Sequence, residues 1–298
     1  MTAEMNGTGG PGGCPRLLSI AGSDSSGGAG IQADLKAFSA HGGYGMTAIT
    51  AITAQNTLGV TAIQALPPAI VAAQIDAVFA DPGVDAVKIG MLADSAIIDA
   101  VADRLLAIPG VPIVLDPVMI AKSGDRLLDG DAIDHLQRLF PMATLLTPNL
   151  PEAERIAHPA GSAGSGPGKG GGPATSLEAR ERLLRRLGDS CPAVLLKGGH
   201  AEGGEVVDLL WDGYRMHAFA HPRLASRATH GTGCTLSSAI AARLARGESL
   251  VTAVSGAIDW LHEAIARAVP LGAGVGPVDH FWMQRRGVLR EPGNSCLA

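Results

Sequence analysis

The stretch THGTGCTLSSAIAARLA, which begins at Thr229, places a cysteine where a glycine-rich turn becomes a helix. The Ala- and Leu-rich residues that follow predict a helix that begins within a residue or two of Thr232. Gly231 and Gly233 lie before its first turn, whose free N–H groups form an anion site. A thiol there should have a lowered pKa and act as a better base or nucleophile. The alternative for Cys234 is a small buried apolar residue near a helix cap.

Other polar side chains follow apolar runs that are typical of buried strands. Asp116 in VLDPVM and Glu152 in TPNLPEAE could share Mg²⁺ through water, although an Asp-Pro turn and a first-turn acid are the structural alternatives. Lys88 and Lys197 end apolar runs and belong to only five lysines among 23 basic residues, and a compact ammonium suits a phosphate. The full set of such positions is Asp24, Ser25, Gln55, Asn56, Lys88, Asp116, Asn149, Glu152 and Lys197.

The elements that must position these residues alternate along the chain. Apolar runs such as DAVKIG, VPIVLDPVM and ATLLTPN are separated by amphipathic segments, which include helices predicted over about 94–108 and 129–140. This alternation predicts a single α/β domain with a mostly parallel sheet and helices on both faces. Asp212-Gly213 predicts an added antiparallel hairpin, and two long helices are expected over about 232–246 and 250–268. Ligands of such sheets bind beyond the carboxyl ends of the strands, where the polar set lies.

The composition restricts the class of partner. The 298 residues carry a net charge of −5 and only 3% aromatic residues, without a basic stripe, so we expect a small-molecule ligand and no nucleic acid. No apolar run reaches the roughly 18 residues that a membrane span needs, so we expect no membrane partner. The cysteines lack metal or disulfide spacing and the first residues lack a signal sequence, which favours the cytoplasm.

Two glycine-rich stretches do not fit common nucleotide motifs. AGSDSSGGAGIQAD follows a strand but lacks the G-x-G-x-x-G spacing of dinucleotide sites, and a tight loop that closes over a ligand fits it better. HPAGSAGSGPGKGGGPATS fails the Walker pattern, because Gly170 rather than Ser or Thr follows Lys169. We therefore expect the residues from about 159 to 175 to be a linker-like insertion.

Several motifs together carry a family resemblance: AGSDSSGGAGIQADLKAFSAHGGYGMTAITAITAQNTLGV, VKIGML, VLDPVMIAKSGDRLL, TPNLPEAE, LLKGGH and THGTGCTLSSAIA. In this order they resemble the hydroxymethylpyrimidine/phosphomethylpyrimidine kinases of thiamin biosynthesis, in the ribokinase-like superfamily. The resemblance runs from about Leu17 to Trp282 and implies a three-layer sandwich. The expected organisation is an N-terminal extension over 1–16, a kinase domain over 17–290 that carries the insertion, and a tail over 291–298.

The resemblance also implies roles for particular residues. The GTGC turn would be the anion hole for the transferred phosphoryl group, with Cys234 as the base for the substrate hydroxymethyl group. The implied anion-hole and catalytic residues are Gly231, Thr232, Gly233 and Cys234. The implied substrate-binding residues are Gln55, Asp34, Gly22, Met91 and Val118. The implied ATP and phosphate ligands are Lys197, Asn149, Lys122 and Thr229, and the implied metal ligands are Asp116 and Glu152.

The implied activity is the transfer of phosphate from ATP, with Mg²⁺, to 4-amino-5-hydroxymethyl-2-methylpyrimidine and then to its monophosphate. The family resemblance further implies a homodimer. Two alternatives are a pyridoxal or pyridoxine kinase of the same fold and a non-catalytic protein that binds a vitamin phosphate. Gln55 argues for a pyrimidine ring because an amide offers both a donor and an acceptor. The complete set of nucleotide-site motifs argues against a mere binding protein.

Overall fold

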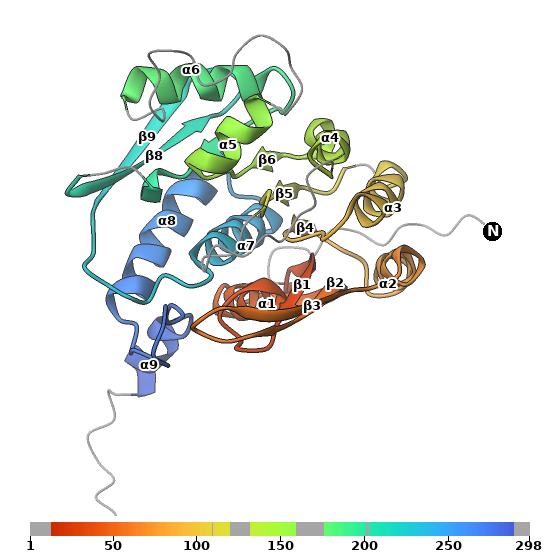
Figure 1. The fold of residues 1–298 in the computed structure, drawn as a ribbon, viewed down its shortest axis with the longest axis horizontal. Helices are drawn as coiled ribbons and strands as arrows, with labels where there is room; N and C mark the ends of the chain where they lie inside the picture. Colours follow the sequence, from red (N-terminus) through yellow and green to blue (C-terminus); the bar gives the residue numbers. More distant parts are fainter. Residues whose placement is uncertain (1–12, 109, 120–131, 159–175, 201–202, 289–298) are drawn as a thin grey trace, which may run out of the picture.

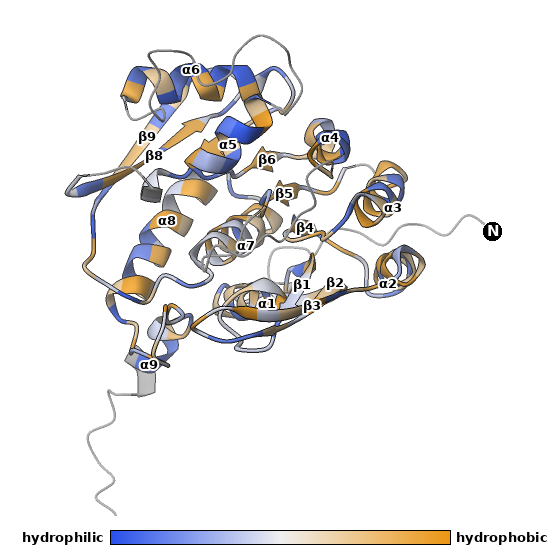
Figure 2. Ribbon diagram, viewed as in Figure 1, coloured by the Kyte–Doolittle hydropathy of each residue, from blue (hydrophilic) through white to orange (hydrophobic). Residues whose placement is uncertain are grey.

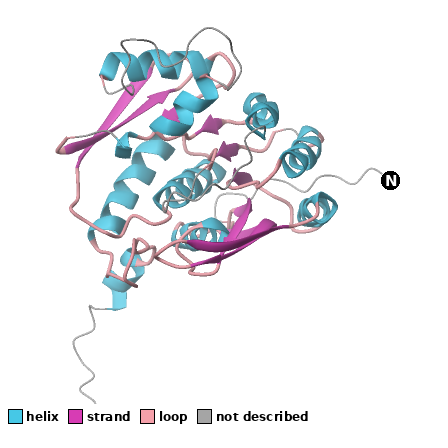
Figure 3. Ribbon diagram, in the orientation of Figure 1, coloured by secondary structure: helices cyan, strands magenta, loops and turns pink. Residues whose placement is uncertain are grey.

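The computed structural model describes residues 13–108, 110–119, 132–158, 176–200 and 203–288. These residues form one nine-stranded sheet with helices on both faces (Figures 1 and 3). The strands are β1 (Arg16–Asp24), β2 (Tyr44–Gln55), β3 (Val60–Ala65), β4 (Ala86–Ile89), β5 (Ile113–Leu115), β6 (Leu145–Leu146), β7 (Val194–Leu196), β8 (Glu205–Trp211) and β9 (Met216–Pro222).

The sheet is parallel at its centre and antiparallel at both edges. Its order is β3-β2-β1-β4-β5-β6-β7-β8-β9, and the pairs from β2 through β7 are parallel. β3 pairs antiparallel with β2, and the hairpin of β8 and β9 adds antiparallel strands beside β7. The predicted mostly parallel α/β fold is therefore confirmed. Its consequence is that six consecutive strands end at the same edge of the sheet.

Two helical layers enclose the sheet. One face carries α1 (Gly30–Ala40), α7 (Thr232–Ala245) and α8 (Leu250–Ala266), and α9 (Trp282–Val288) follows at the end of the described chain. The other face carries α2 (Pro68–Ala80), α3 (Ser95–Leu106), α4 (Ala132–Leu136), α5 (Leu150–Ala157) and α6 (Leu177–Gly188). None of the helices in the described ranges is long and apolar enough to span a membrane.

The core consists of one apolar cluster on each face of the sheet. Every residue of β4 and β5 is buried, which explains why all of them except Lys88 are apolar, without alternation; Figure 2 colours these strands by hydropathy. On the second face, Phe38 of α1 is fully buried together with Leu236 and Ile240 of α7. The packing of α7 on α1 and on the central strands fixes where the first turn of α7 lies.

The structure departs from the predicted elements at three places. The helix predicted over about 129–140 is short, because α4 gives way to a 3₁₀ helix over Gln137–Met142 that contains Pro141, a residue without an N–H donor. β3 and α6 were not among the predicted elements. Most of the predicted N-terminal extension, the insertion and the tail lie outside the described residues.

Candidate active site

A cavity of about 570 Å³ opens at the carboxyl ends of the strands, which is within the usual size of small-molecule sites. Most of the residues that the sequence singled out line it. Ser25, Asp34 and Asn56 do not line it, and Lys122 lies outside the described residues. Those that line it are Gly22, Asp24, Gln55, Lys88, Met91, Asp116, Val118, Asn149, Glu152, Lys197, Thr229, Gly231, Thr232, Gly233 and Cys234.

The GTGC turn forms the N-terminus of α7, as predicted. Gly231 is its N-cap with φ of 73°, a left-handed conformation that glycine adopts without strain. A Cβ at Gly231 would collide with the carbonyl oxygen of Gly28, so the turn packs directly on the loop after β1. No side chain caps the first turn of α7, and Thr232, Gly233 and Cys234 line the cavity. The geometry is that of an anion site.

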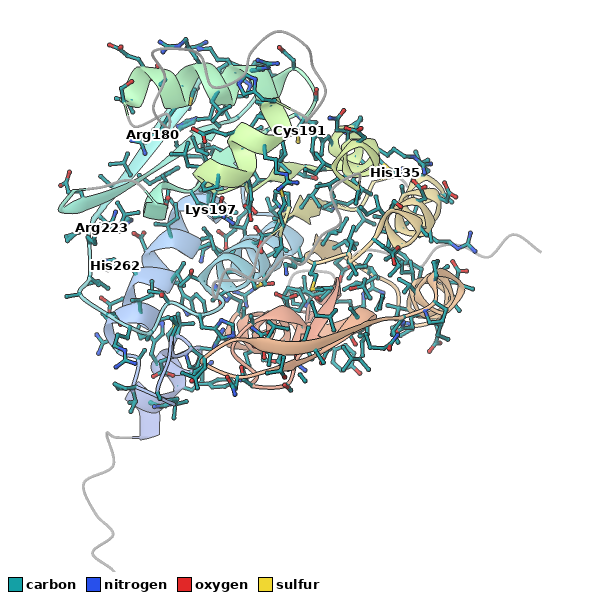
Figure 4. The ribbon with its side chains drawn as sticks, in the orientation of Figure 1. His135, Arg180, Cys191, Lys197, Arg223 and His262 are labelled. Atoms are coloured by element: carbon teal, nitrogen blue, oxygen red, sulfur yellow. The ribbon has the colours of Figure 1, made fainter. Side chains whose placement is uncertain are left out.

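A buried ion pair faces this helix terminus from the ends of β5 and β7. The Nζ atom of Lys197 lies 2.7 Å from Oδ1 of Asp116, which also accepts a hydrogen bond from Oγ1 of Thr147 at 3.2 Å. A Cβ at Gly233 would lie 3.1 Å from the Lys197 nitrogen and 3.3 Å from Oδ2 of Asp116. Burial alone would lower the pKa of Lys197, but the charges of Asp116 and Glu152 raise it. Lys197, labelled in Figure 4, is therefore a permanent cation beside the anion site.

Glu152 has two structural roles at once. It forms a capping box with Asn149: its carboxylate accepts from the Asn149 N–H at 2.8 Å, and the Asn149 side chain accepts from the Glu152 N–H at 2.9 Å. Burial, together with the nearby charge of Asp116 and against that of Lys197, raises the pKa of Glu152 to about 7. The first-turn role that we considered as the alternative is thus real, and it orients the carboxylate along the cavity wall.

The two carboxylates fit a hard divalent cation. The described residues hold no cluster of three or more His, Cys, Asp or Glu side chains of the kind that builds a complete metal cage. Mg²⁺ does not need one, since it takes one or two carboxylates and completes its shell with water and phosphate oxygens. Asp116 and Glu152 both line the cavity, and a cation beside Glu152 would favour its ionised form against the burial that raises its pKa.

The expectation that the helix terminus lowers the pKa of Cys234 is wrong for the free protein. Burial raises the pKa of this thiol to about 11, against the opposing effect of Lys88. Asp34 and Asp116 raise it further. The physical reason is first the burial of the thiol, which disfavours a charged sulfur, and second that Lys88, which would stabilise a thiolate, is already paired with Asp34. Cys234 holds its proton at neutral pH.

Asp34 and Lys88 also differ from the expectation. Both side chains are fully buried, and the Lys88 ammonium lies 2.9 Å from each carboxylate oxygen of Asp34. Ser19 and Ser238 donate two more hydrogen bonds to this carboxylate, at 2.6 and 2.8 Å. Asp34 therefore ties β1, β4 and α7 together and does not itself line the cavity, so its role in ring binding stays a prediction. Lys88 lines the cavity floor but gives its hydrogen bonds to Asp34.

The predicted ring-binding residues gather at the other end of the cavity. A Cβ at Gly22 would lie 3.1 Å from Sδ of Met91, so the strand backbone and the thioether are in contact. Gln55 ends β2, and Ser25 holds its backbone by accepting from the Gln55 N–H and donating to the Gln55 carbonyl, both at 2.8 Å. Its side chain lies between Thr53 and His230.

Sequence reasoning missed several residues of this cavity. His230 lies inside the quoted THGTGC motif, which is the signal that could have found it. Asp208, His221, Arg223 and His262 line the end of the cavity near β9 and α8, where Figure 4 labels Arg223 and His262. No motif marks these residues, because they come from the hairpin and a long helix that meet only in the fold.

A comparison with models of protein families identifies the family of this chain. The family model described as phosphomethylpyrimidine kinase matches residues 24–279. The chain belongs to this family. A hydroxymethylpyrimidine/phosphomethylpyrimidine kinase of Rhizobium meliloti is 50% identical over 267 residues, which cover 89% of this chain and 96% of that protein. A thiamine biosynthesis bifunctional protein of Geobacter sulfurreducens is 49% identical over 89% of this chain, and the chain spans 52% of its length.

Solved structures of the same fold include members of this family and pyridoxal kinases. The phosphomethylpyrimidine kinase of Clostridium difficile has a TM-score of 0.70 and 42% identity, over 84% of this chain and 99% of that one. An ADP complex of Bacillus subtilis pyridoxal kinase has a TM-score of 0.80 and 31% identity, over 91% of this chain and 99% of that one. The ribokinase-like fold expected from the sequence is confirmed.

We predict that Cys234 alkylates slowly in the free protein. At pH 7.5 a thiol with a pKa of about 11 is almost entirely protonated, and the thiolate is the reactive form. Iodoacetamide labelling followed by peptide mass spectrometry should show that the exposed thiol of Cys14 reacts at least roughly tenfold faster. Equal rates for the two cysteines would mean that the helix terminus does lower the pKa of Cys234.

Proposed function

We propose that this chain transfers the γ-phosphoryl group of ATP to the hydroxymethyl oxygen of 4-amino-5-hydroxymethyl-2-methylpyrimidine, and then to the monophosphate so formed. The observation that carries the proposal is that one cavity joins the GTGC turn and the Lys197–Asp116 pair with the amide of Gln55. Phosphoryl transfer needs positioning and charge stabilisation more than covalent chemistry by the protein, and these residues supply both.

The turn and the lysine act on the transferred group. The N–H groups of the first turn of α7 would hold its oxygens, and Lys197 would neutralise part of their charge. Mg²⁺, bound by Asp116 and Glu152 with phosphate oxygens, would screen the charge between the nucleotide phosphates. Asn149 and Thr229, and Lys122 outside the described residues, remain proposed phosphate ligands on the basis of the family resemblance.

Cys234 is proposed as the group that receives the proton of the substrate hydroxyl. The raised pKa in the free protein means that only a small fraction of the enzyme carries the thiolate at neutral pH. A loose transition state tolerates this, since the hydroxyl proton can leave late, after bond cleavage to the leaving oxygen is advanced. The same raised pKa makes a thiolate, once formed, a stronger base than an ordinary cysteine.

The first prediction tests substrate and ring recognition together. In a coupled ADP-release assay the pyrimidine should be phosphorylated with a higher kcat/KM than pyridoxal, and ADP release without acceptor should be slow. Gln55→Met should raise KM for the pyrimidine at least roughly tenfold and leave KM for ATP nearly unchanged, because it removes paired hydrogen bonds from a desolvated pocket. A higher kcat/KM for pyridoxal would reverse the assignment, and ADP release independent of any acceptor would remove it.

The second prediction concerns the proton acceptor. The thiolate fraction rises tenfold per pH unit below the pKa, so kcat/KM should keep rising from pH 7 to 9 and show no plateau near the ordinary cysteine value of about 8.5. Cys234→Ser should lower turnover by roughly a hundredfold and flatten this profile, while Mg·ATP still binds. Wild-type turnover in the serine variant would show that Cys234 only packs against the turn.

We further propose that the chain forms a cytoplasmic homodimer through the face of β2 and β3. Ile52 is 51% exposed there and lies on one face with Ala54 and Ala62, beside the edge strand β3, which carries no charged residue. Light scattering after size exclusion should give a dimer mass, and Ile52→Lys should shift it towards the monomer. Leu106→Lys, a change of a leucine on α3 that is 62% exposed, is the control and should not.

A further inference from the structure

His230 joins three loops behind the ring end of the cavity. Its imidazole is 6% exposed, and its Nε2 atom lies 2.8 Å from Oδ2 of Asp24. A Cβ at Gly28 would collide with the imidazole, so the loop after β1 packs directly against the ring. The main chain of His230 donates to the carbonyl of Gly276 at 2.9 Å. The imidazole is therefore held between the Asp24 carboxylate and the backbone at Gly28.

The partner of this imidazole is an ionised carboxylate. Asp24 also accepts hydrogen bonds from the N–H and hydroxyl of Ser26 and from the N–H groups of Gly28 and Ala29. Burial would raise the pKa of Asp24, but the hydrogen bonds from His230 and Ser26 outweigh it and the pKa is lowered. A carboxylate that only accepts requires a donor opposite it, so Nε2 of His230 carries a proton.

This proton constrains the amide of Gln55. The Gln55 Nε2 position lies 3.4 Å from Nε2 of His230, and two N–H donors cannot bond to each other. The Oε1 position lies 3.1 Å from Oγ1 of Thr53, whose single hydrogen also has the carbonyl of Ser23 within 2.9 Å. One half-turn of the amide removes both conflicts. Its oxygen then faces the His230 N–H, whose single hydrogen is shared between Asp24 at 2.8 Å and, as the longer branch, Gln55 at 3.4 Å, and its N–H donates to Thr53, which donates to Ser23.

We propose that His230, held by Asp24, is a positioning residue that fixes the orientation of the Gln55 amide and so sets which ring edge the enzyme accepts. The fixed amide keeps one N–H and one oxygen lone pair unused, and Gln55 lines the cavity. This donor and acceptor match a 4-aminopyrimidine, whose ring nitrogen accepts and whose amino group donates. They do not match a 4-oxopyrimidine, in which the ring N–H donates and the carbonyl accepts. The inference rests on the proposed reading of the ring by Gln55.

The experiment compares two acceptors in four variants of the full chain. The acceptors are 4-amino-5-hydroxymethyl-2-methylpyrimidine and its 4-oxo analogue, and the measured quantity is the ratio of their kcat/KM values. H230L removes the donor and frees the amide to turn. H230Q returns an amide nitrogen near the place of Nε2. H217L removes a matched histidine from another His–Asp pair, whose contact to Asp212 is 2.6 Å and which lies in the β8–β9 hairpin outside the cavity. Q55M tests the residue that reads the ring.

The expected result is selective. H230L should lower the preference for the amino substrate at least roughly tenfold, through a raised KM for that substrate, with KM for ATP unchanged. H230Q should restore most of the preference, and H217L should leave it as in the wild type. If H230L does not fold, H230N serves in its place, since its amide nitrogen replaces Nδ1 and cannot reach Asp24.

Two outcomes would overturn the inference. The first is an unchanged preference in H230L or H230N, and the second is a loss in H230Q as large as in H230L, which would indicate a merely structural histidine. Q55M separates this failure from that of the proposed function. If Q55M raises the pyrimidine KM and H230L leaves the preference unchanged, only the role of His230 fails. If neither variant affects the pyrimidine, Gln55 does not read the ring.

Discussion

The site depends on the direct contact of two backbones, at Gly28 after β1 and at Gly231 before α7. A side chain on either glycine would collide with the opposite loop: a Cβ at Gly231 with the carbonyl of Gly28, and a Cβ at Gly28 with the imidazole of His230. Because the loops touch, the N-terminus of α7 lies within reach of both the ring end and the phosphate end of the cavity. Larger residues would separate the loops and leave the anion site without its substrate.

Each of the two strand-end lysines at the cavity forms an ion pair with an aspartate, and the burial of the pair distinguishes the two lysines. Lys88 gives its hydrogen bonds to Asp34, whereas Lys197, paired with Asp116, stays at the wall beside Gly233. The first pair is fully buried and fastens the sheet to α7. The second lines the cavity and can exchange partners with a phosphate or a cation. Two strand-end lysines with similar sequence context therefore differ in burial: the Lys88 side chain is fully buried, whereas the Lys197 side chain is 15% exposed.

Local patterns are visible in the sequence, whereas burial and contacts between distant elements are not, and this difference explains what the sequence could and could not predict. Continuous apolar strands and the glycine turn are local patterns, so the parallel sheet, the start of α7 and the polar residues at the strand ends followed from them. Gly22, Met91 and Val118 came only from the family resemblance. The burial of Asp34 did not follow, because IQAD places it on a helix without saying what faces that helix. The prediction of a lowered pKa for Cys234 failed for a related reason. A helix terminus is visible in the sequence, but the burial of the thiol and the nearby carboxylates of Asp34 and Asp116, which raise the pKa, are set only by the fold. β3 is exposed over four of its six residues and carries no core pattern to detect.

Similarity of the backbone to solved structures does not indicate which substrate ring a kinase of this fold accepts. The Bacillus subtilis pyridoxal kinase has the higher TM-score, 0.80 against 0.70, although the Clostridium difficile phosphomethylpyrimidine kinase has the higher identity, 42% against 31%. The fold thus supplies the anion site and its ion pair, while ring choice belongs to a few side chains at the other end of the cavity. A single amide can carry that choice only if its two ends cannot exchange, since a freely turning amide presents a donor and an acceptor in either order. If Gln55 reads the ring as proposed, selectivity for a ring edge depends on the groups that hold its amide, and the side chains that contact it here are Thr53 and His230, the latter paired with Asp24.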